Sequence, residues 1–263
     1  MGLSPADDLP LAHLLADVAD GLSLARYRAD DLVVDTKPDL TPVTEADRAV
    51  EQALRSLLAE HRPADRVLGE EFGGRLDAAG RQWVIDPIDG TKNYVRGVPV
   101  WATLICLVVD GTATTAVVSA PALGRRWWAA PGMGAHARGP EGQRRLRVSS
   151  VSRLADASFS FSDGVGWAPG ALAALTDQVW RARAYGDFWS HLLVAEGAVD
   201  LAAEPQLNPW DIAALIPIVE QAGGRITGYD GAPALTAGSG LTSNGLLHTA
   251  ALALVDTGGT SAP

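Results

Sequence analysis

Residues 83–91 read Trp-Val-Ile-Asp-Pro-Ile-Asp-Gly-Thr, and this stretch carries the strongest evidence about the fold. Its first three residues predict a short buried strand that stops at Asp86-Pro87, which places carboxylates at the end of a strand. Gly90 allows a backbone amide to approach a ligand closely, because glycine has no Cβ. If a helix begins at Gly90 or Thr91, its unpaired N–H groups and positive dipole end face the same point as the carboxylates.

This combination suits a divalent cation that lies between the carboxylates and a phosphate group. Magnesium fits, because it prefers hard oxygen ligands and often binds through a few carboxylates and a substrate phosphate. The structural alternative is a loop in which Asp86 and Asp89 only cap the turn that follows them.

Three further acidic segments each allow a structural alternative as well. Asp47 stands in a possible capping box with Thr44 as the helix N-cap. Asp211 could be an ordinary acid in the first turn of a helix. Glu70 and Glu71 follow a probable strand at 66–68. Because all of these alternatives would have to hold together, the pattern favours one shared acidic site.

The length, charge and cysteine content limit the size of the core, the partners and the compartment that we expect for this protein. The chain has 263 residues, of which 47% are hydrophobic and 20% charged, enough for one large core or two fused ones. A formal charge of −10 argues against a nucleic-acid partner. The N-terminus lacks signal-peptide features and no apolar run is long enough to span a membrane, so we expect a cytoplasmic protein. The single cysteine, Cys106, is expected to be a buried thiol in a reducing compartment.

Hydrophobic periodicity predicts the elements of the first half. A helical stripe runs from Leu11 to Ala25, and a second helix follows Thr44. Asp110-Gly111 predicts a hairpin turn, and another hairpin is expected around residues 127–134. The polar, glycine-containing stretch 139–152 marks the sub-domain boundary.

The second half alternates strands with helices, which indicates an α/β layer arrangement. Strands are expected near 158–161, 182–185 and 199–203, and helices near 168–180, 188–196 and 210–221. Pro217 is expected to kink the last of these helices. Residues 256–263 are expected to be a disordered tail.

The segments 69–71, 83–91 and 210–214 closely resemble the signature segments of the inositol-monophosphatase superfamily. The likeness extends from the first helix to residues 244–248. Within the superfamily, residues 35–44 and 183–188 are most similar to those of actinobacterial histidinol-phosphate phosphatases. The resemblance implies an α/β fold, an αβαβα sandwich of two fused sub-domains at 1–145 and 146–255. The first would hold most metal and phosphate ligands, and the second would hold Asp211 and the residues that select the substrate.

The resemblance also implies the site, with two to three Mg²⁺ ions. The first metal would be bound by Glu70, Asp86 and the carbonyl of Ile88, and the second by Asp86, Asp89 and Asp211. A third, optional metal would lie near Glu70. Asp47 and Thr91 would orient the attacking water, so that the catalytic residues are Asp47, Thr91 and Glu70. The residues that would contact the phosphate or the rest of the substrate are Asp89, Gly90, Thr91, Arg183, Gly186, Asp187, Phe188, Glu204 and Asp211.

The implied reaction is the hydrolysis of L-histidinol phosphate, in histidine biosynthesis, by in-line attack of a metal-activated water without a phosphoenzyme. Asp187 and Glu204 would balance the charges of the substrate's amine and imidazole. Alternatively, Asp187 caps a helix that begins at Phe188. Arg183 would lie near the phosphate or a neighbouring subunit.

Several alternatives remain open at the level of sequence. The protein could be an inositol monophosphatase, a related sugar or nucleotide phosphatase, or a non-catalytic metal-binding regulator. Trp127-Trp128 could form an exposed patch that supports the homodimer implied by the family, or could belong to the core or an edge strand. His13 and His191 are interpreted as solvent-facing or satisfied core residues rather than ligands. No zinc-type His/Cys spacing and no Gly-x-Ser-x-Gly motif occurs in the sequence.

Overall fold

The computed structural model describes residues 5–37 and 41–255, with side chains from Asp8 onward. The predicted tail, residues 256–263, lies outside the described residues, as do Pro38, Asp39 and Leu40 of the segment 35–44. In chain order, the elements before residue 146 are α1 (Pro5–Arg26), β1 (Val34–Thr36), β2 (Pro42–Thr44), α2 (Glu45–His61), β3 (Arg66–Gly69), β4 (Arg81–Asp89), α3 (Thr91–Val95), β5 (Ala102–Val109), β6 (Thr112–Ala120), β7 (Arg125–Ala130), β8 (Gly134–Gly139) and β9 (Gly142–Arg145).

The elements after residue 146 alternate as the sequence predicts. They are β10 (Ser158–Ser160), α4 (Ala171–Thr176), β11 (Arg181–Arg183), α5 (Asp187–Ala195), β12 (Leu201–Glu204), α6 (Pro209–Ile212), α7 (Leu215–Gln221), β13 (Arg225–Thr227), α8 (Ala234–Ala237), β14 (Gly240–Ser243) and α9 (His248–Val255).

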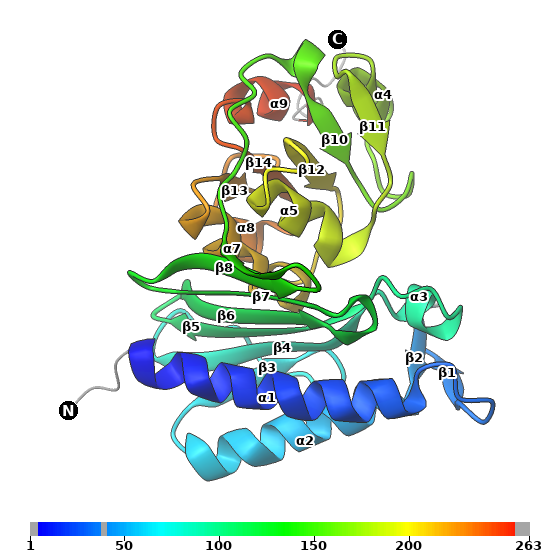
Figure 1. Cartoon of the computed structure of the whole chain (residues 1–263), viewed down its shortest axis with the longest axis vertical. Coiled ribbons are helices and arrows are strands. Elements are labelled where there is room, and N and C mark those ends of the chain that lie inside the picture. Colours follow the sequence, from blue (N-terminus) through cyan, green and yellow to red (C-terminus); the bar gives the residue numbers. More distant parts are fainter. Residues whose placement is uncertain (1–4, 38–40, 256–263) are drawn as a thin grey trace.

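The described residues stack in five layers (Figure 1). Helices α1 and α2 cover one face of a large sheet, which has the strand order β3-β4-β5-β6-β7-β8-β9. Helices α5 and α7 lie between this sheet and a small sheet, which has the order β11-β10-β12-β14-β13. Helices α4 and α9 cover the outer face of the small sheet. This arrangement confirms the predicted αβαβα fold class, while the division at residue 146 into two sub-domains stays a prediction.

The packing of β4 explains why residues 83–85 form a continuous apolar run. Trp83 and Ile85 pack with α1 and α2, whereas Val84 between them packs on the opposite face with the α7 side of the core. Both faces of the large sheet are therefore buried, so no polar alternation appears in its central strands. Cys106 of the neighbouring strand is buried as predicted.

Two local expectations concern prolines: the strand end at Asp86-Pro87 was wrong, whereas the disruption of a helix by Pro217 was predicted. The strand at 83–85 does not stop at Asp86-Pro87 but continues to Asp89, with a bulge between Asp86 and Asp89. A proline is tolerated there because a bulge interrupts the ladder of hydrogen bonds. The helix expected at 210–221 is divided into α6 and α7, since Pro217 has no N–H to donate to the carbonyl of Ala213.

Both predicted hairpins are confirmed. Asp110 and Gly111 have positive φ angles of 48° and 75°, which a type I′ turn between β5 and β6 requires. In the second hairpin Trp127 is fully buried, so the core interpretation of this residue holds rather than the exposed patch. Trp128 is half-buried and contacts His13, with ring centroids 5.2 Å apart.

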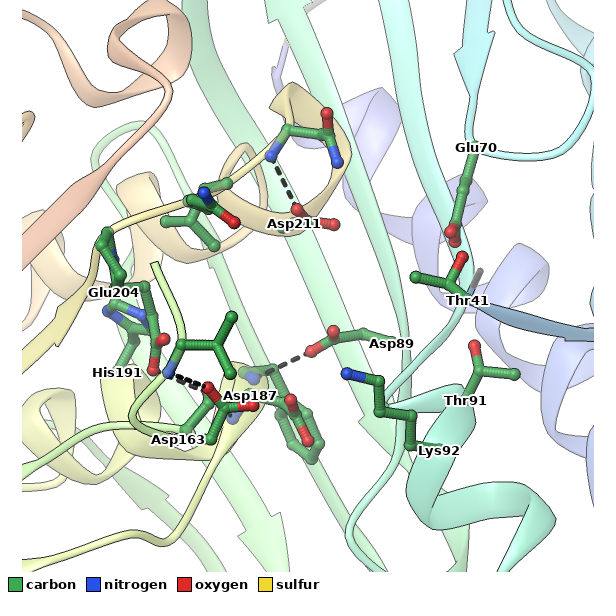
Figure 2. Close-up of a pocket in the computed structure, with 18 of the residues that line it drawn as sticks. Thr41, Glu70, Asp89, Thr91, Lys92, Asp163, Asp187, His191, Glu204 and Asp211 are labelled. Atoms are coloured by element: carbon green, nitrogen blue, oxygen red, sulfur yellow. Dashed lines mark hydrogen bonds between the residues drawn. The ribbon is translucent and has the colours of Figure 1, made fainter. Parts of the chain in front are cut away.

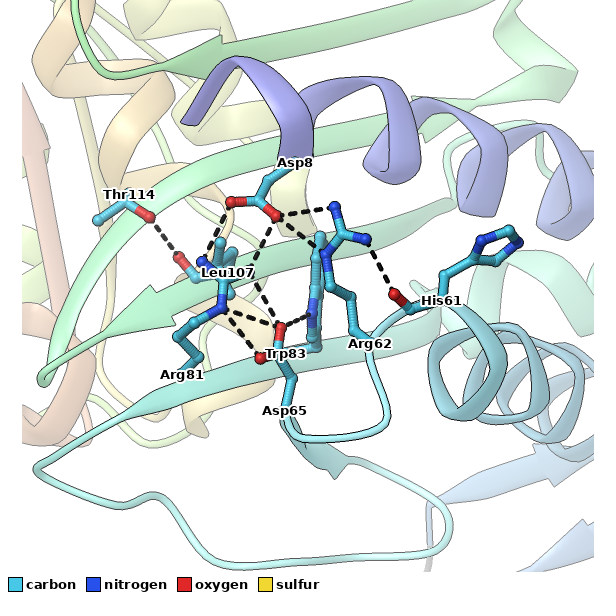
Figure 3. Close-up of polar contacts among 8 residues, drawn as sticks. All are labelled: Asp8, His61, Arg62, Asp65, Arg81, Trp83, Leu107 and Thr114. Carbon is cyan, nitrogen blue, oxygen red and sulfur yellow. Dashed lines mark hydrogen bonds and ion pairs between the residues drawn. The ribbon is translucent and has the colours of Figure 1, made fainter. Parts of the chain in front are cut away.

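A polar network fastens α1 to the large sheet (Figure 3). Asp8 of α1 accepts hydrogen bonds from Arg81 at 2.8 Å and from Arg62 at 3.3 Å. Asp65 accepts from Arg81 at 2.9 Å and from the indole nitrogen of Trp83 at 3.0 Å. The buried carboxylate of Asp8 is therefore balanced by two guanidinium groups.

Candidate active site

A cavity of about 570 Å³ opens between the large sheet and the small sheet. Residues from both halves of the chain line it, and its labelled side chains fall into two groups (Figure 2). Glu70, Thr91 and Lys92 lie at one end, and Asp163, Asp187 and Glu204 lie at the other. We call these the phosphate end and the far end.

Three carboxylates meet between the two ends. Asp86 and Asp89 come from β4 and Asp211 comes from α6, and their oxygens lie within 4.8 Å of one another. Asp86 is 2% exposed, and its Oδ1 atom has no hydrogen-bond partner in the described part of the chain. We call Asp86, Asp89 and Asp211 the acidic centre.

Burial and mutual repulsion dominate the electrostatics of the acidic centre. Burial, reinforced by the charges of Glu70 and Asp89, raises the pKa of Asp86 well above its usual value. Burial also raises the pKa of Asp89, together with the charges of Asp187 and Asp211. The pKa of Asp211 is raised to about 7, again chiefly by burial. Carboxylates held together against their repulsion suit a bound cation.

Backbone groups hold two of these carboxylates in place. The N–H of Phe188 donates to Asp89 Oδ2 at 2.8 Å, which joins the first turn of α5 to β4. The N–H of Asn208 donates to Asp211 Oδ2 at 2.7 Å. Each of these carboxylates thus has one oxygen engaged by the backbone. The donor chemistry of the acidic centre fits a hard divalent cation such as Mg²⁺.

Glu70 lies in the same pocket but outside the group of three oxygens. Its carboxylate contacts Lys37, whose ammonium lies 2.7 Å from Glu70 and 2.6 Å from Glu71. Burial alone would lower the pKa of Lys37, but its hydrogen bonds to both glutamates outweigh burial and raise it. This contact involves Oε1 of Glu70, and the predicted role of Glu70 as a metal ligand stays a prediction.

Asp47 caps helix α2 and also contacts Thr91, which lines the pocket. Its Oδ2 accepts from the N–H of Thr44 at 2.8 Å, which completes the predicted capping box of α2. The hydroxyl of Thr91 lies 3.3 Å from Asp47 Oδ1 and 2.9 Å from the carbonyl of Ile88. The predicted water-orienting pair is therefore in contact, beside the backbone carbonyl predicted to bind metal.

Gly90 precedes α3 and has a φ angle of 82°. A Cβ at this position would lie 2.9 Å from the carbonyl of Val100 and 3.2 Å from Asp187 Oδ2. Both the backbone conformation and the close approach require glycine. As predicted, the helix begins at Thr91, directly after the acidic turn.

At the far end, the alternative role for Asp187 as a helix cap was wrong. Helix α5 begins at Asp187 itself, its N-cap is Gly186, and no side-chain cap bond forms there. Asp187 instead accepts a hydrogen bond from Asn93 Nδ2 at 2.9 Å. The turn is strained, because Asp187 has a φ angle of 47°.

The other residues predicted to contact substrate divide into two groups. Phe188 and Glu204 line the pocket, and Glu204 accepts from the hydroxyl of Ser162 at 2.7 Å. Burial raises the pKa of Glu204 to about 8. Arg183 and Gly186 are absent from the pocket lining that the described residues form. Arg183 lies exposed on β11 and donates to the adjacent carbonyl of Ala182, whereas Gly186 is buried as the N-cap of α5.

Comparison with known proteins agrees with this geometry. The model of the inositol monophosphatase family matches residues 10–259. The chain belongs to this family. A histidinol-phosphatase of Mycobacterium tuberculosis is 59% identical over 258 residues, covering 96% of this chain and 99% of that protein. A histidinol-phosphatase of Streptomyces coelicolor is 55% identical over 251 residues, covering 92% of this chain and 94% of that protein.

A solved structure also resembles the chain. The IMPase of Thermotoga maritima superimposes with a TM-score of 0.85 at 31% identity, covering 95% of this chain and 97% of that one. The predicted membership of the inositol monophosphatase family is therefore confirmed. The protein is accordingly a metal-dependent phosphatase that acts on small phosphate esters. No helix in the described part of the chain has the length and apolar character needed to cross a bilayer.

Sequence reasoning missed several pocket residues of this inositol monophosphatase family member. Lys92 lines the phosphate end, and Asp163 with Ser162 lines the far end. Asp163 follows the strand β10, and an acid after a strand was the available signal. His191 was misinterpreted, because it is buried and lines the pocket while its Nε2 atom has no partner among the described residues.

Proposed function

We propose that this protein is a Mg²⁺-dependent phosphomonoesterase that hydrolyses L-histidinol phosphate to L-histidinol and phosphate in histidine biosynthesis. The main supporting observation is the acidic centre, in which three carboxylates converge. Asp86 is the buried member, and its Oδ1 atom has no positive partner among the described residues. The histidinol-phosphatases that match almost the whole chain support the choice of substrate.

In this proposal Asp86, Asp89 and Asp211 hold Mg²⁺, and Glu70 with the carbonyl of Ile88 completes the site for two to three ions. Bound Mg²⁺ neutralises charge on the phosphate ester and makes a water molecule easier to deprotonate. Lys92 and the amides of the first turn of α3 face the phosphate at the same end of the pocket.

The attacking water is oriented by Thr91 and Asp47. The Thr91 hydroxyl donates toward the Ile88 carbonyl and Asp47, which leaves its oxygen free to accept a hydrogen bond from a water. Burial raises the pKa of Asp47, so that this carboxylate takes up a proton more readily than an exposed aspartate does.

The far end supplies the preference for a cationic alcohol. Asp163, Asp187 and Glu204 line it, and L-histidinol carries an amine and an imidazole. The carboxylate of Asp187 attracts the protonated amine. Burial raises the pKa of Glu204 to about 8, so near neutral pH this side chain can donate a hydrogen bond to the imidazole or transfer its proton to it. A neutral polyol such as inositol offers neither a cation nor a ring nitrogen. In this proposal Asp187 and Glu204 have the roles that the family resemblance implies for them.

The test is a phosphate-release assay with and without Mg²⁺, in which L-histidinol phosphate is compared with inositol-1-phosphate. We expect Mg²⁺-dependent release and a preference of more than about tenfold in kcat/KM, which is roughly 1.4 kcal/mol. Equal rates, or faster release from inositol-1-phosphate, would contradict the substrate. No release from a broad panel of esters would favour a non-catalytic regulator.

Two further parts of the proposal can be measured separately. Hydrolysis in ¹⁸O-labelled water should place the label in the released phosphate, whereas a trapped phosphoprotein would contradict direct attack. We also propose a homodimer, as the family resemblance implies. Light scattering after size-exclusion chromatography would measure its mass.

A further inference from the structure

His191 lies on α5 at the far end of the pocket and is 1% exposed. Its Nδ1 atom lies 2.7 Å from the hydroxyl of Thr242 on β14. Its Nε2 atom is equally buried and has no hydrogen-bond partner in the described ranges. Figure 2 shows the ring beside Glu204, away from Glu70 and Thr91. A buried polar atom at a pocket wall needs a partner, which a ligand can provide.

A second buried histidine, His248, provides a comparison for the hydrogen bonding of the His191 ring. His248 is also fully buried, and both of its nitrogens have partners. Its Nε2 lies 2.9 Å from the hydroxyl of Thr227, and its Nδ1 lies 2.9 Å from that of Ser243. His248 is outside the pocket lining formed by the described residues. The incomplete pairing of His191 therefore coincides with its position at the pocket.

The strand pairing brings His191 and Glu204 to one wall. Glu204 is paired with Gly240 across β12 and β14. A Cβ at Gly240 would lie 3.8 Å from Cε1 of His191, the carbon between the two ring nitrogens. The same strand pair thus carries the carboxylate of Glu204 and supports the ring of His191.

The His191 ring is suited to an uncharged hydrogen bond. Burial lowers the pKa of His191 to about 4, so the imidazole is neutral at physiological pH. A neutral imidazole has one donor and one acceptor nitrogen. Because the Thr242 hydroxyl can donate to Nδ1 or accept from it, Nε2 can be either the donor or the acceptor toward a ligand.

We propose that His191 determines specificity by forming a hydrogen bond from its Nε2 atom to the imidazole ring of the substrate, next to Glu204. This inference rests on the proposed function, which names L-histidinol phosphate as the substrate. The two ring nitrogens of the substrate would then meet two different partners, the carboxylate of Glu204 and the imidazole of His191. A site with two buried polar groups discriminates strongly against alcohols that lack matching atoms.

The test compares L-histidinol phosphate with glycerol 2-phosphate, which contains no nitrogen ring. In His191→Phe we expect kcat/KM for L-histidinol phosphate to fall about tenfold or more relative to glycerol 2-phosphate, chiefly through KM. His191→Gln, which keeps a polar group near the position of Nε2, should recover part of the ratio. His248→Phe is the matched control: it should lower the melting temperature and leave the ratio unchanged.

The outcomes separate the two proposals. A wild-type protein without preference for L-histidinol phosphate overturns the proposed function. A wild-type preference that persists in folded His191→Phe, with a ratio within about twofold, overturns only the role of His191. If His191→Phe does not fold, ¹⁵N NMR of the wild-type ring nitrogens, assigned with His191→Gln, decides. Addition of L-histidinol with Mg²⁺ should shift the Nε2 resonance of His191, and an unchanged resonance overturns the inference.

Discussion

Two groups of buried carboxylates in this protein differ in their positive partners. In the network of Figure 3, Asp8 and Asp65 each accept hydrogen bonds from Arg81, and Asp8 also from Arg62. In the acidic centre, the pKa values of all three carboxylates are raised by burial, and Asp86 Oδ1 has no partner within the described residues. The first group is neutralised by the chain itself, while the second accumulates negative charge beside a pocket.

The difference separates a structural role from a functional one. A buried carboxylate is costly unless it is paired, so a paired group fastens elements together. An unpaired group of carboxylates stores repulsion that a cation from solution relieves. The same substitution of aspartate by asparagine should therefore have opposite consequences in the two groups.

The largest effect is expected from Asp89→Asn. Loss of one anionic ligand should reduce phosphate release by about a thousandfold or more, because the metal that activates the reaction is no longer held correctly. Asparagine can still accept the hydrogen bond from Phe188, and one repulsive charge is removed, so the Mg²⁺-free variant should melt at the wild-type temperature or above. Assays of phosphate release and thermal melting measure both effects. Near-normal activity would remove Asp89 from the metal site.

A smaller effect is expected from Asp8→Asn, which should lower the stability of the protein, whereas Asp89→Asn should not. The change leaves Arg62 and Arg81 with a weaker acceptor and should lower the free energy of unfolding by about 2 kcal/mol. Activity at temperatures well below melting should not change. Asp35→Asn is the matched control, because its ion pair with Arg48 is about half exposed and worth less than about 1 kcal/mol. Equal melting temperatures for the two variants would contradict a structural role of the network.

The third effect appears only when the pH is varied, and it concerns Glu204. Its pKa rises from 4.5 to about 8 on burial, so the folded protein binds this proton more tightly than the unfolded chain. Stability from this group is therefore lost as the pH rises from about 4.5 to about 8. The stability of Glu204→Gln relative to wild type should therefore increase between pH 5 and pH 9, because glutamine carries no charge at either pH. A difference independent of pH in metal-free melting curves would show that Glu204 does not titrate in this way.

Much of the fold was predictable because local rules suffice for it. The apolar periodicity located α1 and α2, and Asp110-Gly111 located a hairpin. The disruption of a helix by Pro217 was predicted, but the effect of Pro87 was not, since it depends on which hydrogen bonds the neighbouring residues make. The predicted strand therefore ended too early, and the predicted helix was in fact divided.

The candidate site was predictable only where residues lie in a motif. Asp86, Asp89, Gly90 and Thr91 follow one strand, and their proximity to one another is a local property. Lys92 and Asp163 were missed, and His191 was misinterpreted, because nothing in their immediate sequence indicates which surface they face. A histidine on an apolar helix face has the same pattern whether its second nitrogen meets a protein group or a pocket.

The sequence by itself determined the alternation of strands and helices in the second half, the acidic turn after β4 and the family of the protein, because these depend on periodicity and on contiguous motifs. The layer order was implied by the family resemblance. The family resemblance implied that Asp211 joins Asp86 and Asp89, and the tertiary structure brings the three together. The contact of Lys37 with Glu70 came from the tertiary structure alone. It also placed His191 in the pocket lining and left its buried Nε2 atom without a hydrogen-bond partner among the described residues. The physical reason is that contacts between distant segments depend on how the helices and sheets pack, and side-chain directions follow from that packing.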